Sequence, residues 1–155
     1  MNIKKHLLRT TILGYVKNIN WLAPFALTLT LKQRVDNHKL DIMTASKNIK
    51  HFLNRLNRSL YGNAFKRFSK SIKIFPVIEH GPDKRFHVHA IIDKPATVDD
   101  VSFYHLIKYS WSKTKFGYDH IHIQPMTNDG WISYLTKFDQ KPDYDLAIDW
   151  MNLTK

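Results

Sequence analysis

Hydrophobic and polar residues alternate along four segments of the chain, and this pattern predicts β-strands. The segment PFALTLTLK is typical, because large apolar residues occupy every second position, as in a strand with one buried face. The four expected strands cover residues 24–32, 71–80, 86–93 and 118–126.

The second and third of these strands are expected to form a hairpin. The turn sequence GPDK, residues 81–84, separates them by only a few residues and brings their ends together. Pro76 lacks the N–H that a central strand needs, so it places the second strand at a sheet edge or at a bulge.

Apolar residues spaced three and four positions apart predict helices elsewhere in the chain. Gly62 is expected to end the second helix, and Thr97 to cap the start of the third. The fourth is expected to open at Asn128 or Asp129. The four expected helices, the first of them short and basic, cover residues 1–20, 41–62, 97–113 and 128–141.

After the first helix, the order of elements is β-α-β-β-α-β-α. This order predicts an α+β fold with a central antiparallel sheet and flanking helices, of the split ferredoxin-like kind. The chain has 155 residues, 43% of them hydrophobic, which is enough for one domain with a real core. We therefore expect a single domain that spans residues 1–155.

Charge is distributed unevenly around the formal net value of +11. Residues 1–75 carry 15 Lys and Arg against two Asp, a net charge of +13, whereas residues 76–155 carry 9 against 11 acidic residues, a net charge of −2. A strongly positive half attracts a polyanion, and nucleic acid is the commonest one. The residues expected to contact DNA phosphates are Lys50, Arg58, Lys66, Arg67 and Lys70.

Composition also bears on metal binding and location. The chain has no cysteine, so any metal ion must be held by His, Asp or Glu. Arg9, Lys17 and Asn18 interrupt the apolar run near the N-terminus, unlike a signal peptide, and no run approaches the roughly 18 apolar residues of a membrane span. We expect no membrane partner and a cytoplasmic location, in the host cell if a virus or plasmid encodes the protein.

The candidate metal ligands lie on the expected hairpin. His87 and His89, in KRFHVHAIIDKP, are two residues apart in a strand and therefore point to the same face. The hairpin turns Glu79 back alongside them. One carboxylate and two imidazoles leave open positions on a bound ion and suit Mg²⁺, Mn²⁺ or Zn²⁺. A second pair, His120 and His122, is the weaker alternative, because no carboxylate precedes it on a hairpin.

The expected helix 128–141 carries the candidate nucleophile. Its apolar stripe leaves Tyr134 and Lys137 to one side, three residues apart and thus neighbours on the helix surface. A phenol has a reference pKa near 10 and is a poor nucleophile at neutral pH, so a nearby ammonium and a metal-polarised phosphate would both help it to attack. An ordinary boundary tyrosine on an amphipathic helix is the alternative.

Together these motifs resemble those of HUH endonucleases of the rolling-circle replication initiator (Rep) type. The shared sequences follow the family's order: FALTLT at residues 25–30, HVH at residues 87–89 and YLTK at residues 134–137. The resemblance covers residues 24–141 and implies the HUH endonuclease fold, a central antiparallel sheet with flanking helices.

The resemblance implies a role for each candidate residue. Glu79, His87 and His89 would bind a divalent metal, Mg²⁺ or Mn²⁺. Tyr134 would attack the scissile phosphodiester of single-stranded DNA, leaving a 5′-phosphotyrosine and a free 3′-hydroxyl, and Lys137 would steady the charge of the site. That hydroxyl could prime replication or rejoin the strand. No nucleotide cofactor is implied, because the phosphotyrosine ester conserves the energy of the bond.

The resemblance also implies partners. The substrate would be single-stranded DNA or an origin hairpin. The chain has no GxxxxGK[ST] motif, so a helicase domain is not expected, and a host helicase and polymerase would act in trans. Gly130 stands where relatives with two tyrosines carry the second, so a single catalytic tyrosine is expected.

Other functions fit parts of the pattern. A single-tyrosine HUH transposase or relaxase is the nearest alternative. A non-catalytic module that binds single-stranded nucleic acid is the second, since a basic ferredoxin-like sheet with exposed aromatic residues can bind strands without chemistry. A metal-dependent oxygenase is a remote third, because it would leave the Tyr and Lys helix unexplained.

Overall fold

A four-stranded antiparallel sheet forms the centre of the computed structural model, which describes residues 2–80, 83, 85–138 and 147–154. Its strands are β1 (Pro24–Leu31), β4 (Ile74–His80), β5 (Phe86–Asp93) and β6 (Gly117–Pro125). The spatial order is β4-β5-β1-β6, and every neighbouring pair is antiparallel. This is the strand order of a ferredoxin-like sheet, so the expected α+β class and the expected hairpin are both confirmed.

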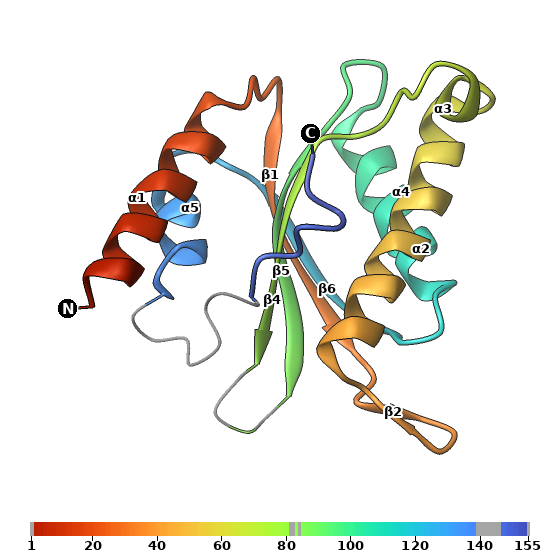
Figure 1. The fold of residues 1–155 in the computed structure, drawn as a ribbon. Coiled ribbons are helices and arrows are strands. Elements are labelled where there is room, and N and C mark those ends of the chain that lie inside the picture. The colour runs from red at the N-terminus through yellow and green to blue at the C-terminus, as the bar shows by residue number, and fades with distance from the viewer. Residues whose placement is uncertain (1, 81–82, 84, 139–146, 155) are drawn as a thin grey trace.

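Helices cover the two faces of the sheet unequally (Figure 1). The long helix α2 (Ile42–Tyr61) and α4 (Asp100–Ser112) lie on one face, which we call the helix face. The helix α1 (Ile3–Asn18) and the short α5 (Gly130–Leu135) lie on the other, which we call the site face. A single turn, α3 (Ala64–Arg67), follows α2 at the end of the sheet where β4 begins.

The main core lies between the sheet and the helix face. Alternate residues of β1, such as Leu27 and Leu29, are buried there against Phe52 and Leu56 of α2. The ring of Phe52 also meets Trp111 of α4 edge-on, with centroids 5.5 Å apart. Burying a side chain of this size is worth roughly 1.5–3 kcal/mol, so this layer supplies most of the hydrophobic stabilisation.

A smaller core lies on the site face. Phe75, Val77 and Ile91 of the sheet pack against Ile132 and Leu135 of α5, together with part of α1. This cover is incomplete, because on β6 the site-face residues His122 and Gln124 are exposed. Polar side chains on the site face can therefore meet a ligand.

The structure corrects the ends of two expected helices. Asp99, and not Thr97, caps α4, because its carboxylate accepts a hydrogen bond from the backbone N–H of Ser102 at 2.9 Å. The helix expected over residues 128–141 ends at Leu135. The hydroxyl of Thr136 donates to the carbonyl of Ile132 at 2.9 Å, a local hydrogen bond that competes with continued helix.

A second, two-stranded sheet was not predicted. Strands β2 (Arg34–Val35) and β3 (His38–Lys39) form a hairpin that extends from the end of β1. Asp36 in its two-residue turn has a positive φ of 52°, which Asp tolerates better than most residues. Strands of two residues are too short to show an alternating pattern, so this hairpin is invisible to periodicity.

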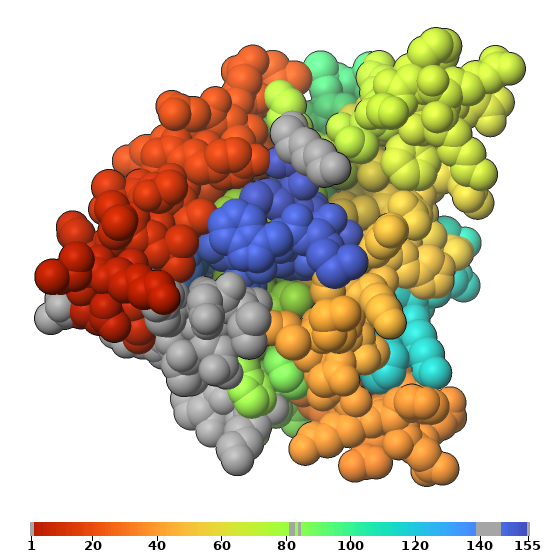
Figure 2. All heavy atoms as spheres, in the orientation of Figure 1, coloured from red at the N-terminus to blue at the C-terminus, as the bar shows by residue number. Residues whose placement is uncertain are grey.

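The C-terminal segment, residues 147–154, covers the outer edge of β4. The backbone N–H of Asp149 donates to the carbonyl of Pro76 at 3.1 Å, and that of Thr154 donates to Ile74 at 3.1 Å. The segment lies between α1 and α2 on the molecular surface (Figure 2). Pro76 is therefore in an edge strand, as predicted, and the edge is protected from pairing with other chains.

No helix among the described residues is both long enough and apolar enough to cross a membrane.

Candidate active site

The hairpin of β4 and β5 places the predicted metal ligands together. Glu79 pairs directly with His87, and His89 lies diagonally across from Glu79 on the same face. The Oε2 atom of Glu79 and the Nε2 atom of His89 are 3.1 Å apart. Their side chains are only 17% and 14% exposed, so their interaction is weakly screened by solvent.

Thr28 of β1 holds the other side of the His89 ring. Its hydroxyl is 3.0 Å from Nδ1 of His89, across the paired strands. A hydroxyl can donate or accept, so Thr28 can accompany either neutral tautomer of the ring. When Thr28 accepts from Nδ1–H, the lone pair of Nε2 is directed toward Glu79, which is the orientation a metal ligand needs. The FALTLT motif had no assigned chemistry from sequence, and Thr28 supplies one.

Trp131 fixes the position of α5 over this group. Its indole N–H donates to the carbonyl of Ala90 at 2.8 Å, and its ring meets His89 edge-on at 5.5 Å. The Tyr134 ring stacks on Trp131, with centroids 5.1 Å apart, and meets His89 edge-on at 5.6 Å. Sequence reasoning assigned Trp131 to the apolar stripe and missed its contact with the site. The spacing of Trp131 and Tyr134, three residues apart, was the available signal.

The environment of Tyr134 disfavours its ionised form. Partial burial against Trp131 raises the pKa of the phenol above its usual value, and the negative charge of Glu79 raises it further. The residue is still 43% exposed, so a substrate can reach it. A phenolate at this position needs positive charge from elsewhere.

Lys137 lies beyond the end of α5 rather than on the same helix as Tyr134. Its backbone N–H donates to the Tyr134 carbonyl at 3.3 Å, which keeps the two residues close in the turn that follows the helix. Its side chain is exposed. The two residues are neighbours through a turn, and the expected helical spacing between them was wrong.

The geometry of Glu79 and His89 fits two adjacent ligands of one ion. Ligand atoms at about 2.0–2.2 Å from a metal and at right angles to each other are about 3 Å apart, close to the 3.1 Å between these two atoms. Within the described part of the chain, no three His, Asp or Glu side chains already converge on one point. His87 shares the strand face and pairs with Glu79, so its backbone is placed for a third ligand.

The second His-x-His pair lies on β6, at the other edge of the sheet. His122 pairs with Thr28 and faces the same side as His89, but it is exposed. His120 contacts Asp119 at 3.2 Å, and both side chains are about four-fifths exposed, at 82% and 78%. No tyrosine or tryptophan of α5 is in ring contact with them.

The basic residues expected to contact DNA lie away from this group. All five are on α2 or on the turn that follows it, and Lys50, Arg58, Lys66, Arg67 and Lys70 are all exposed. The turn precedes Ile74 at the start of β4, whereas Glu79 lies near its end. Five residues of extended strand separate these positions by about 17 Å. The structure therefore does not bring these residues to the site.

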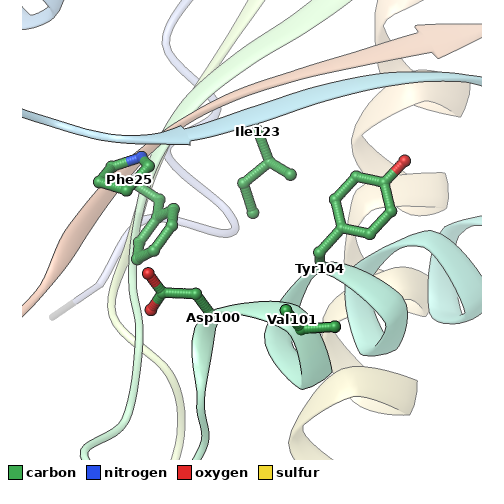
Figure 3. Close-up of a pocket in the computed structure, with 6 residues that line it drawn as sticks. Phe25, Asp100, Val101, Tyr104 and Ile123 are labelled. Carbon is green, nitrogen blue, oxygen red and sulfur yellow. The ribbon is translucent and has the colours of Figure 1, made fainter.

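A shallow pocket of about 240 Å³ opens between β1, β6 and the start of α4 (Figure 3). It is lined mainly by apolar side chains, among them Phe25, Val101 and Ile123, and by the carboxylate of Asp100. Phe25 and Ile123 belong to the helix face. The pocket is therefore on the side of the sheet opposite Glu79 and His89.

An α+β protein with a ferredoxin-like sheet and a His, Glu and Tyr group on its open face is consistent with a replication initiator of the Rep type. A family model for replication-associated proteins of the ORF2 kind matches residues 24–143, more than two thirds of the chain, and the chain belongs to this family. The searches of curated proteins and of solved structures found no match. Family membership supports a role in the initiation of DNA replication and is compatible with a nuclease function.

Proposed function

We propose that the protein nicks and rejoins single-stranded DNA by tyrosine transesterification, with a divalent metal, to initiate rolling-circle replication. The observation that carries the proposal is the position of Tyr134, whose ring meets His89 while His89 contacts Glu79. A solvent-accessible phenol thus lies beside a carboxylate and imidazole pair whose spacing suits one ion.

The reaction needs one bond to form and one to break. The Tyr134 oxygen attacks the phosphorus of the scissile phosphodiester, and the bond from phosphorus to the 3′-oxygen breaks. The phenolic proton is released to solvent, and the leaving oxygen takes up a proton to become a 3′-hydroxyl. The 5′-phosphate stays attached to Tyr134, so attack by a 3′-hydroxyl reverses the step and rejoins DNA.

The residues of the site would divide the work. Glu79, His87 and His89 would hold Mg²⁺ or Mn²⁺, which when bound supplies positive charge to the phosphate and the attacking oxygen. Thr28 orients the His89 ring, and Trp131 holds Tyr134 over it. Lys137, exposed and one turn away, would approach the DNA phosphate through its long, flexible side chain.

The substrate is proposed to be single-stranded DNA or the exposed strand of an origin hairpin. The free 3′-hydroxyl would prime synthesis, while a host helicase and polymerase would unwind and copy the template. No nucleotide is needed for the chemistry, because the energy of the broken bond is kept in the phosphotyrosine. Lys50, Arg58, Lys66, Arg67 and Lys70 would contact parts of a long strand that lie far from the nick.

The test is capture of covalent products from a randomised single-stranded DNA library in the presence of Mn²⁺. The wild-type protein should form adducts that survive denaturant, and sequencing should reveal the preferred site. Tyr134→Phe should form none and should keep its affinity for DNA. Tyr118→Phe is the matched control, because Tyr118 is exposed on β6 and away from Glu79.

Two results would count against the proposal. If the wild-type protein forms no adduct with any library member, the function is binding without chemistry. If Tyr134→Phe still forms adducts, another tyrosine is the nucleophile, and Tyr144, which lies outside the described residues, is the next to replace.

A further inference from the structure

The β2–β3 hairpin is tied to the strand that carries the candidate metal ligands. The side-chain amide of Gln33 contacts both backbone groups of Phe86: its oxygen accepts from the N–H at 2.8 Å, and its nitrogen donates to the carbonyl at 3.1 Å. The backbone N–H of Leu40 donates to the Gln33 carbonyl at 2.8 Å and closes the hairpin. Phe86 precedes His87, so the base of the hairpin lies one residue from the site.

The hairpin presents an arrangement of charge that is unfavourable without a partner. Arg34 and Lys39 pair directly across its two strands, and like charges in this position repel. Both are exposed, as is Lys32 just before them. Among the described residues, no carboxylate forms an ion pair with any of the three. An anion held between Arg34 and Lys39 would relieve the repulsion.

The chemistry of the pair favours phosphate over other anions. A planar guanidinium beside an ammonium matches the several oxygens of a phosphodiester, and exposed cations next to a nicking site lie on the path of its substrate. The hairpin offers no large apolar surface for a protein partner, since Val35 packs inward against the main core.

We propose that Lys32, Arg34 and Lys39 bind backbone phosphates of single-stranded DNA beside the scissile bond, and that the hairpin is a phosphate clamp. The inference rests on the proposed function for the location of the scissile bond. It assigns a near contact to the hairpin and leaves far contacts to the turn at Lys66, Arg67 and Lys70. Because Gln33 fixes the hairpin to Phe86, a phosphate bound there is held at a defined distance from His87.

The test is the affinity for a short oligo(dT) strand, measured by fluorescence anisotropy over a salt series without metal. Replacing Lys32, Arg34 and Lys39 by Gln should weaken binding roughly tenfold at low salt, as expected for the loss of about 1.4 kcal/mol. The slope of log affinity against log salt should become shallower by about two, since three phosphate contacts to a single strand are lost. The matched control replaces Lys66, Arg67 and Lys70 by Gln.

A second variant changes binding in the opposite direction. Asp36 is the one acidic residue of segment 32–40, and Asp36→Asn removes its charge while keeping a side chain that tolerates the positive φ. This variant should bind oligo(dT) more tightly than the wild type. Circular dichroism and thermal melting show that each variant is folded before its affinity is compared.

The outcomes separate the inference from the proposed function. An unchanged slope in the hairpin variant, or an equal loss in the control on the short strand, would overturn the phosphate clamp. An unchanged affinity in Asp36→Asn would do the same. Adduct formation by the wild type is measured apart from binding, so its failure would reject the nickase and leave the salt result intact.

Discussion

Strands β5 and β6 carry the same pattern, His-x-His, on the same face of one sheet, yet their surroundings differ. On β5, His89 is mostly buried between Glu79, Thr28 and the two aromatic rings of α5. On β6, the corresponding side chains are exposed at a sheet edge. The difference shows that a motif of two histidines becomes a site only through the strands and helix beside it.

The two strands differ because of sheet order. The neighbour of β5 on its outer side is β4, which supplies Glu79, whereas β6 has no outer neighbour among the described strands. Replacing single residues on each strand, with the other strand as the control, would test this comparison.

The largest expected effect comes from the histidines themselves. His89→Ala should lower Mn²⁺-dependent adduct formation by roughly a hundredfold or more, because a ligand and the support of Tyr134 are lost together. His122→Ala should retain most activity. Rates of adduct formation on one captured substrate measure both, and the reverse pattern would move the metal site to β6.

A smaller effect is expected at Thr28, which contacts both strands in the register. Thr28→Val removes the hydroxyl beside Nδ1 of His89 and should raise the Mn²⁺ concentration for half-maximal nicking by roughly tenfold. Thr28→Ser should restore it.

Thr30→Val is the control for this prediction, because the Thr30 hydroxyl donates to the His120 carbonyl on the β6 side. Equal effects at both threonines would mean that sheet stability, and not orientation of His89, is being measured.

A further prediction concerns the stability of the two sides. Trp131→Phe leaves the Ala90 carbonyl without its donor and should lower the free energy of unfolding by about 1–2 kcal/mol. His120→Ala, at an exposed position, should change it by less than about 0.5 kcal/mol. Urea denaturation measures both, and similar losses would contradict the contrast in burial.

The smallest effect is on the acidity of Tyr134. Glu79→Gln removes a negative charge near the phenol, so in metal-free protein the pKa of Tyr134 should fall toward its usual value. The fall should be partial, because burial is the larger cause of the raised pKa and is unchanged. Absorbance at high pH follows the phenolate, with His122→Gln as the control, and an unchanged Tyr134 pKa would place Glu79 electrostatically out of reach.

The hairpin with Glu79 and His87 could be predicted because its two strands are adjacent in sequence and joined by a clear turn. The contact of Thr28 with His89 could not, because the register of β1 against β5 is set by packing of the whole sheet. The early end of α5 depends on one Thr136 hydroxyl, and the β2–β3 hairpin on one turn residue. Charge indicated a basic half but gave no direction, so it favoured α3 although that turn lies at the far end of β4 from Glu79.

The central position of β1 has a consequence for how the molecule folds. The Thr28 and His89 contact joins residues 61 apart in sequence, and β1 must also pair with β6, which comes later still. Contacts of such long range require loop closure before they gain stability, and they slow folding. The β4–β5 hairpin can form locally with Glu79 and His87 in place, but His89 acquires its Thr28 partner only when β1 enters the sheet. During refolding, nicking activity should therefore return with the slow cooperative phase that completes the sheet, and not with early hairpin formation.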